Sequence, residues 1–207
     1  MTKKRERVIV FIDGFNLYFG LKEKGWKKYY WLNVKKLAAS LVTPKQVLVH
    51  TKYFTAKITK PNSKRKRQEA FLSALGTLSD FSIYYGRYQS FTAICKKCGH
   101  KHIQSNEKRT DVNIATHMLV DAFQDSFDTA ILISADSDLT LPILEIRRLF
   151  PRKYIKIAFP PARSSYDLRN VAPTCFQIYE TKLRKSLFPD EVVLATGYTV
   201  TRPKSWR

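Results

Sequence analysis

Acidic residues are scarce in this sequence. Its 207 residues include 17 Asp and Glu against 37 Lys and Arg, which gives a formal net charge of +20. Every acid that is committed to a cleft leaves the outer surface still more basic. Such a surface favours a polyanionic partner.

Cysteines and long apolar runs are also few. The chain has three cysteines, two of them close neighbours, so we do not expect a disulfide framework. No apolar run approaches the roughly 20 residues that cross a bilayer. The run at 8–12 follows a basic head and is too short for the core of a signal peptide. We therefore expect a cytoplasmic protein that binds no membrane.

Several motifs of well-known enzymes are missing. The sequence has no Gly-x-Ser-x-Gly turn, no Walker Gly-Lys-Ser/Thr loop and no Gly-x-Gly-x-x-Gly dinucleotide fingerprint. A phosphatase with an aspartyl nucleophile would need a second acid two residues after Asp13, where Phe15 stands instead. These absences argue against serine hydrolases, P-loop enzymes and dinucleotide-dependent enzymes.

Strand-like and helix-like segments alternate along the chain. Apolar, β-branched segments predict strands at 8–12, 46–56, 81–89, 129–134 and 154–159. Helices are expected at 14–24, 33–41, 63–79, 110–123 and 139–149. This alternation predicts an α/β fold, with a mostly parallel central sheet and helices on both faces. Since no repeat or low-complexity linker is present, we expect one domain with a small Cys-containing insertion at about 90–106.

Aspartates follow two of the expected strands. Asp13 follows the strand at 8–12, and Asp136 and Asp138 follow the strand at 129–134. The carboxyl ends of parallel strands border the ligand crevice of an open sheet, so these carboxylates are expected to converge. Like charges in a cleft are costly unless a cation lies among them, and oxygen ligands of this kind suit Mg²⁺ or Mn²⁺.

Asp111 adds a further carboxylate from the helix expected at 110–123. The apolar positions of that helix predict its sheet-facing side, and Asp111 falls on the same side, so it should point inward near the strand ends. These apolar positions are Ile114, Ala115, Met118, Leu119, Ala122 and Phe123. Asp121 falls off this face, and we expect it to be solvated.

Structural roles stay open for most of these groups. Asp13 and Asp138 could each be the N-cap of the helix that follows, and Thr110 could cap the helix in which Asp111 stabilises the dipole. No helix cap explains Asp136. Asn16 could bond the backbone, or it could serve as a neutral ligand for a phosphate or a metal-bound water. A shared metal site accounts for the carboxylates together.

Basic and aromatic residues indicate a nucleic-acid substrate. The phosphates of a single-stranded nucleic acid bind cations, and its unpaired bases stack on exposed rings. Candidate rings are those of Tyr84, Tyr85, Tyr88 and Phe91. A charge run can equally be a solvated surface, and rings in a strand can belong to the core. The candidate contacts are Lys64, Arg65, Lys66, Arg67, Arg87, Lys108 and Arg109.

Cysteine and histidine cluster within the expected insertion. Cys95 and Cys98 have the spacing of a zinc knuckle, and His100 or His102 could be a third ligand. A fourth ligand is missing locally, and Cys175 is far along the chain. A structural Zn²⁺ site, a redox-active pair and a plain loop all stay open.

In combination and in order, the acidic segments resemble the signature segments of the NYN domain family. This family is a branch of the PIN-like nucleases that includes LabA-type bacterial proteins. The matching segments are Ile-Asp-Gly-Phe-Asn-Leu at 12–17, Lys-Arg-Thr-Asp-Val-Asn-Ile-Ala at 108–115 and Ile-Ser-Ala-Asp-Ser-Asp-Leu at 133–139. The similarity continues through 147–151, 158–161 and 165–169, so it covers roughly residues 7 to 180. Ala135 replaces a frequent Gly of the family, and Pro173 stands where many relatives carry an acid.

The resemblance implies a Rossmann-like PIN fold and a metal-dependent ribonuclease site. It places Asp13, Asp111, Asp136 and Asp138 at the family's acidic positions and Asn16 at its associated Asn. Residues 1–180 would form the nuclease domain and 181–207 a C-terminal extension. A catalytically silent nucleic-acid-binding regulatory module, or the nuclease component of a toxin or defence system, are the alternatives. RNA as substrate rests on the resemblance alone, and the sequence does not predict the oligomeric state.

Overall fold

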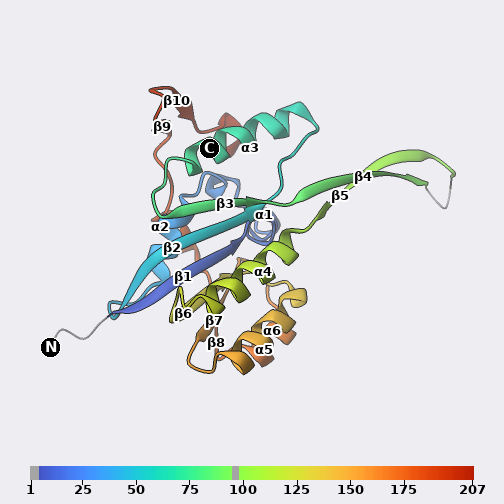
Figure 1. Cartoon of the computed structure of the whole chain (residues 1–207). Coiled ribbons are helices and arrows are strands. Elements are labelled where there is room, and N and C mark those ends of the chain that lie inside the picture. The colour runs from blue at the N-terminus through green and yellow to red at the C-terminus, as the bar shows by residue number, and fades with distance from the viewer. Residues whose placement is uncertain (1–4, 95–97) are drawn as a thin grey trace.

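A six-stranded, wholly parallel sheet forms the centre of the molecule, with strand order β3-β2-β1-β6-β7-β8. The structure is a computed structural model that describes residues 5–94 and 98–207 (Figure 1). The six strands are β1 (Glu6–Asp13), β2 (Gln46–Thr55), β3 (Phe81–Tyr85), β6 (Thr129–Ile133), β7 (Tyr154–Phe159) and β8 (Thr174–Gln177). Strand β8 was not expected from the sequence, because its four residues give too short a pattern.

Helices cover both faces of this sheet. The helices packed on one face are α1 (Gly14–Glu23), α2 (Val34–Leu41) and α3 (Asn62–Leu75). Those on the opposite face are α4 (Thr110–Phe123), α5 (Thr140–Leu149) and α6 (Tyr166–Val171). Strand β1 contributes Val8, Val10 and Ile12 to the first face and Ile9 and Phe11 to the second, because side chains alternate along a strand. The predicted α/β class, with a parallel central sheet and helices on both faces, is confirmed.

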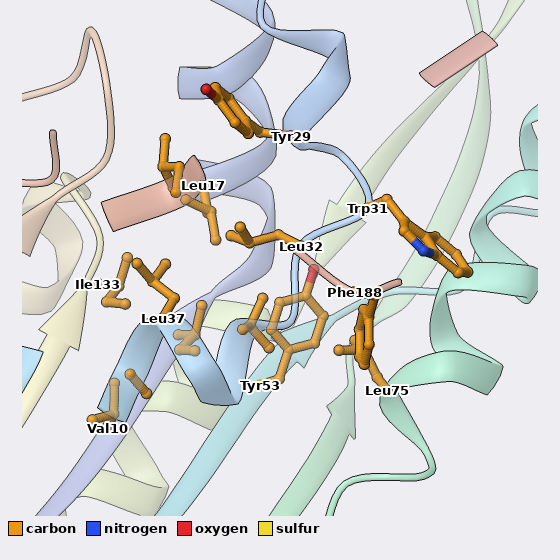
Figure 2. Close-up of a cluster of buried hydrophobic side chains, with 14 of the residues drawn as sticks. Val10, Leu17, Tyr29, Trp31, Leu32, Leu37, Tyr53, Leu75, Ile133 and Phe188 are labelled. Atoms are coloured by element: carbon orange, nitrogen blue, oxygen red, sulfur yellow. The ribbon is translucent and has the colours of Figure 1, made fainter. Parts of the chain in front are cut away.

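The core on the α1–α3 face includes residues from the C-terminal part of the chain. Figure 2 shows Phe188 close to Trp31 and Leu75, and the indole N–H of Trp31 donates to the carbonyl of Pro189 at 2.7 Å. The C-terminal elements are α7 (Glu180–Arg184), β9 (Glu191–Val193), β10 (Thr199–Thr201) and a 3-10 helix, η3 (Lys204–Trp206). Residues after 180 therefore complete the same hydrophobic core as the central strands.

A long antiparallel ribbon replaces the last part of the strand expected at 81–89. Strand β3 ends at Tyr85, and the chain leaves the sheet at Gly86 to form β4 (Arg87–Ile94), which pairs with β5 (Lys101–Lys108). The ribbon extends away from the body of the molecule (Figure 1). β-Favouring residues continue across Gly86, so the sequence pattern did not reveal the change of pairing partner.

Several boundaries differ from expectation on the helical side. Helix α3 ends at Leu75 instead of continuing to 79, and α5 begins at Thr140 after a short 3-10 turn, η2 (Ser137–Leu139). The ring of Phe123 is 78% exposed, although its spacing placed it on the buried side of α4. It is the last residue of α4 and directly follows the buried Ala122, so the burial of this face ends one residue earlier than its spacing predicted. No helix among the described residues is both long and apolar enough to cross a membrane.

Asp121 was expected to be solvated, and this prediction is wrong. Its exposed fraction is 5%, and its carboxylate pairs with the ammonium group of Lys52 on β2. Periodicity alone cannot find such a pair, because the partner lies on another element.

Candidate metal centre

The sheet topology brings the ends of β1 and β6 together. The chain runs from β1 outward to β2 and β3 on one side, whereas β6, β7 and β8 continue on the other side. Ligands of open α/β sheets bind beyond the carboxyl ends of the strands at such a reversal of strand order. Asp13 is the last residue of β1, and Asp136 comes three residues after the end of β6.

Three of the predicted acids converge at this point. Asp13, Asp111 and Asp136 each offer a carboxylate oxygen, and these oxygens all lie within 4.8 Å of one another. Asp13 is 2% exposed, and the other two residues are half-buried. Asp111 reaches the site from the first turn of α4, which crosses toward the strand ends. A sheet and a helix therefore supply one cluster of hard oxygen donors.

Asp13 is held rigidly by two neighbours. Its Oδ1 accepts the backbone N–H of Asn16 at 2.9 Å, so it caps α1, and its Oδ2 accepts from Asn16 Nδ2 and Ser134 Oγ, both at 2.9 Å. Burial raises the pKa of Asp13, the hydrogen bonds from Asn16 and Ser134 lower it, and the nearby charge of Asp136 raises it further. The net direction is upward, because the burial of Asp13 is the largest of these effects.

The second strand end is bonded to the same network. The N–H of Asp136 donates to Ser134 Oγ at 3.1 Å, and the N–H of Ala135 donates to Asn16 Oδ1 at 3.3 Å. Ser134 is fully buried. Ser134 was not among the predicted site residues, although its position two residues before Asp136 was a usable signal. Ser134 and Asn16 thus join the two strand ends that carry the acids.

The capping roles differ from those considered for the sequence. No capping role was expected for Asp136, but it is the N-cap of η2, since its Oδ1 accepts the N–H of Asp138 at 3.0 Å. The cap of α4 is Arg109, in a left-handed conformation with φ of 79°, and Thr110 is the first helical residue. Asp138 is exposed and does not belong to the group of three converging acids.

Gly14 allows α1 to start immediately after Asp13. A Cβ atom on Gly14 would lie 2.6 Å from the ring of Tyr53 and 2.7 Å from the carbonyl oxygen of Phe54. Any other residue would push the first turn of α1 away from β2, and the cap formed by Asp13 would move with it. The glycine therefore positions the carboxylate through the backbone.

The donor set of the centre suits a divalent cation. No lysine or arginine within the described ranges forms an ion pair with Asp13 or Asp136, so the structure shows no basic side chain that offsets their charge. Carboxylates gathered this closely, with one almost wholly buried, are stable in their charged form when a metal ion lies among them.

The basic candidates fall into two groups. Lys64 and Arg67 line a cavity of about 1450 Å³ beside the metal centre. Arg65 and Lys66 do not line it, and Arg65 pairs with Glu69 at 3.6 Å. The second group consists of Arg87, Lys108 and Arg109, which are exposed where the ribbon joins the body. Arg87 on β4 lies directly opposite Lys108 on β5 in the antiparallel register. The cavity of the first group is also lined by Gly14, which follows Asp13, and Arg109 of the second group lies two residues before Asp111.

The proposed zinc ligands are only partly described. Cys98 and His100 are exposed in the connection between β4 and β5, whereas Cys95 and the side chain of His102 lie outside the described residues. Zinc binding at these residues stays a prediction.

Taken together, a Rossmann-like parallel sheet with three aspartates at its switch point defines an α/β protein of the PIN-like type. Residues 7–180 match the NYN domain, and the chain belongs to this family. The predicted resemblance is thereby confirmed, and membership implies a PIN-like nuclease domain that binds nucleic acid and depends on a metal. Comparison with curated proteins gave no match.

Solved structures give further support for the fold. The crystal structure of VPA0982 from Vibrio parahaemolyticus RIMD 2210633, a protein of unknown function, matches with a TM-score of 0.58 and 18% sequence identity. The match covers 91% of this chain and 99% of that one. Acinetobacter baumannii MurG matches with a TM-score of 0.38 and 10% identity over 89% of this chain and 43% of that one, which supports no argument. At these identities the comparison concerns the fold alone.

Proposed function

We propose that this chain is a cytoplasmic, metal-dependent ribonuclease that hydrolyses phosphodiester bonds in single-stranded RNA. The observation that carries the proposal is the convergence of Asp13, Asp111 and Asp136 within 4.8 Å at the switch point of the sheet. Membership of the NYN family and the net charge of +20 support a nucleic-acid substrate.

The three converging aspartates would hold Mg²⁺ or Mn²⁺. Both ions prefer carboxylate oxygens, and either fits a site that is open on its solvent side. When bound, a divalent ion lowers the pKa of a coordinated water and offsets the negative charge that develops at phosphorus. Asp138, exposed two residues beyond Asp136, is the proposed fourth acidic member, at the rim of the site.

The chain's own polar groups have distinct tasks in this proposal. Asn16 and Ser134 orient Asp13 through three hydrogen bonds, which keeps its carboxylate aimed at the other acids. Arg87, Lys108 and Arg109 stand at the base of the ribbon, where their charges would hold the phosphates of the substrate. No histidine is needed as a base, because a divalent ion held by the acids would supply that chemistry.

Cleavage of a labelled single-stranded RNA tests the proposal directly. We expect cleavage with Mg²⁺ or Mn²⁺, none with chelator, and a loss of roughly a hundredfold or more in Asp13→Asn, Asp111→Asn and Asp136→Asn. Glu191→Gln, which removes one exposed acid from the distant strand β9, is the matched control and should cut normally. Full activity in two of the three aspartate variants would refute the assignment.

Thermal unfolding supplies a readout that does not depend on activity. A metal that binds only the folded protein raises its midpoint of unfolding, so Mn²⁺ should stabilise the parent more than Asp13→Asn. Without metal the variant should be as stable as the parent or more so, because one of the crowded charges is gone. A protein that binds metal and RNA but cuts neither RNA nor DNA would be the silent binding module instead, and faster cutting of DNA would overturn the RNA assignment.

A further inference from the structure

A large cavity lies beside the metal centre on the α1–α3 side of the sheet. Its volume of about 1450 Å³ exceeds the roughly 300–1,000 Å³ of most sites for small ligands. Gly14 and Phe15, which directly follow Asp13, line it, and so does Trp206 from η3. The cavity therefore reaches from the catalytic strand end to the C-terminal segment.

The charge that lines this cavity has a single sign. Its lining contains five cations and no acid; the cations are Lys22, Lys27, Lys60, Lys64 and Arg67. Among the described residues, none of the five has a carboxylate partner within 4.0 Å. By contrast, Arg65 and Lys28, which do not line the cavity, pair with Glu69 and Glu180. The positive field in the cavity is left uncompensated.

Aromatic rings from several separate elements form much of the remaining wall. Tyr18 and Phe19 of α1 are 39% and 40% exposed. The ring centroid of Tyr18 lies 4.9 Å from that of Tyr30. The rings of Phe15 and Tyr88, which lies on the ribbon, form an edge-to-face contact with 6.1 Å between their centroids. Trp206 also belongs to the lining. Partly exposed rings beside unpaired cations are the combination that binds unpaired nucleotides.

We propose that this cavity is the binding channel for the unpaired RNA segment adjoining the scissile phosphate. Bases stack on the rings around Tyr18, and phosphates lie against Lys64 and Arg67. The identity of the ligand rests on the proposed nuclease function. A duplex already stacks and pairs its bases, so it cannot offer their faces to these rings. The channel thereby selects single strands over duplexes. Of the basic run at 64–67, only Lys64 and Arg67 line the channel and bind phosphates in this proposal.

The charge component is tested by binding in the presence of chelator, where no cleavage occurs. A short fluorescein-labelled single-stranded RNA is titrated against the parent and the Lys64→Gln/Arg67→Gln variant at several salt concentrations. Each lost phosphate contact lowers the salt slope by about 0.7, so the double variant should lose about 1.4. Arg65→Gln/Lys66→Gln removes the same charge from the same helix, outside the cavity, and should lower the slope much less. Equal losses in the two variants would overturn the assignment.

The stacking component is tested with Tyr18→Leu. Loss of one base–ring contact should weaken binding of the single-stranded RNA by about fivefold to a hundredfold. Tyr198→Leu, which removes a more exposed ring outside the cavity, is the control. A duplex of the same sequence should bind the parent less tightly and respond less to Tyr18→Leu. Parent protein that binds the duplex as well as the single strand would exclude the channel.

These results separate this proposal from the proposed function. If RNA is cut but neither cavity variant affects binding, the nuclease assignment stands and the channel is wrong. If the single strand binds through Tyr18, Lys64 and Arg67 but no nucleic acid is cut with any metal, the channel stands and the nuclease assignment is wrong.

Discussion

The Lys52 ammonium lies 2.7 Å from Oδ2 of Asp121, which links β2 to the last turn of α4. The two side chains are only 11% and 7% exposed, and the ammonium also lies over the rings of Phe11 and Tyr84, 5.9 Å and 5.6 Å from their centroids. A buried charge pair of this kind contributes little net stability, but each member depends on the other. It fixes the helix that carries Asp111.

Removing one member of this pair should be costly. We expect Lys52→Met to lower the free energy of unfolding by about 3–5 kcal/mol, because Asp121 would keep a buried charge without its partner. Urea denaturation measures the change. Lys52→Met/Asp121→Leu should recover most of the loss, since no charge then remains to be compensated. A single variant as stable as the parent would show that the pair is solvated.

Ser134 offers a test of how Asp13 is positioned. Ser134→Ala removes the hydroxyl that donates to Asp13 and accepts from the N–H of Asp136, so RNA cleavage should fall by about 10- to 100-fold. The concentration of Mn²⁺ needed for half-maximal stabilisation should rise, which a purely structural role would not cause. Ser137→Ala, an exposed serine three residues away, is the control. Unchanged metal dependence would argue against a positioning role.

Acid should weaken the attachment of the start of β1. Arg7 donates to both oxygens of Asp128 at 2.7–3.2 Å, and these hydrogen bonds lower the pKa of Asp128 from 3.8 to about 2. Because the folded pKa lies below the unfolded one, the stabilisation is complete above about pH 4 and is lost as the pH falls toward 2.

The variant Asp128→Asn isolates this contribution. The Asp128 side chain is 40% exposed, so solvent screening reduces the expected loss near neutral pH to about 1 kcal/mol. Urea unfolding of parent and variant should give free energies that approach each other near pH 2. A difference that stays constant between neutral pH and pH 2 would contradict the assignment.

The cysteine-containing tip of the ribbon is tested by elemental analysis. If Cys95 and Cys98 bind zinc, protein prepared without chelator should contain about one zinc ion per chain, and Cys95→Ser should lose it. Cys175→Ser, which alters a half-buried thiol in β8, should keep the zinc. Because the core strands do not depend on the tip, loss of zinc should weaken RNA binding more than cleavage. Zinc-free protein with normal activity would rule the site out.

Two of the acidic motifs could be predicted because each follows an apolar run whose type the sequence makes plain. The strands 8–12 and 129–134 are buried on both faces, so they appear as continuous apolar runs, and parallel pairing brings their carboxyl ends to one edge. Asp111 was placed by helical periodicity, which worked because the first turn of α4 faces the sheet. The residues that orient these acids were harder to find, since Ser134 acts only through contacts with Asp13 and Asp136.

By itself the sequence determined the α/β class, the family and the aspartates at the strand ends, because these depend on short-range periodicity and on motifs contiguous in the chain. Tertiary structure alone decided that Asp121 is buried against Lys52 and that the chain leaves the sheet after Tyr85. It also decided that Lys64 and Arg67, but not Arg65, line the cavity. These outcomes depend on which distant element lies opposite a side chain, and residues far apart in sequence carry no local pattern that reveals their contact.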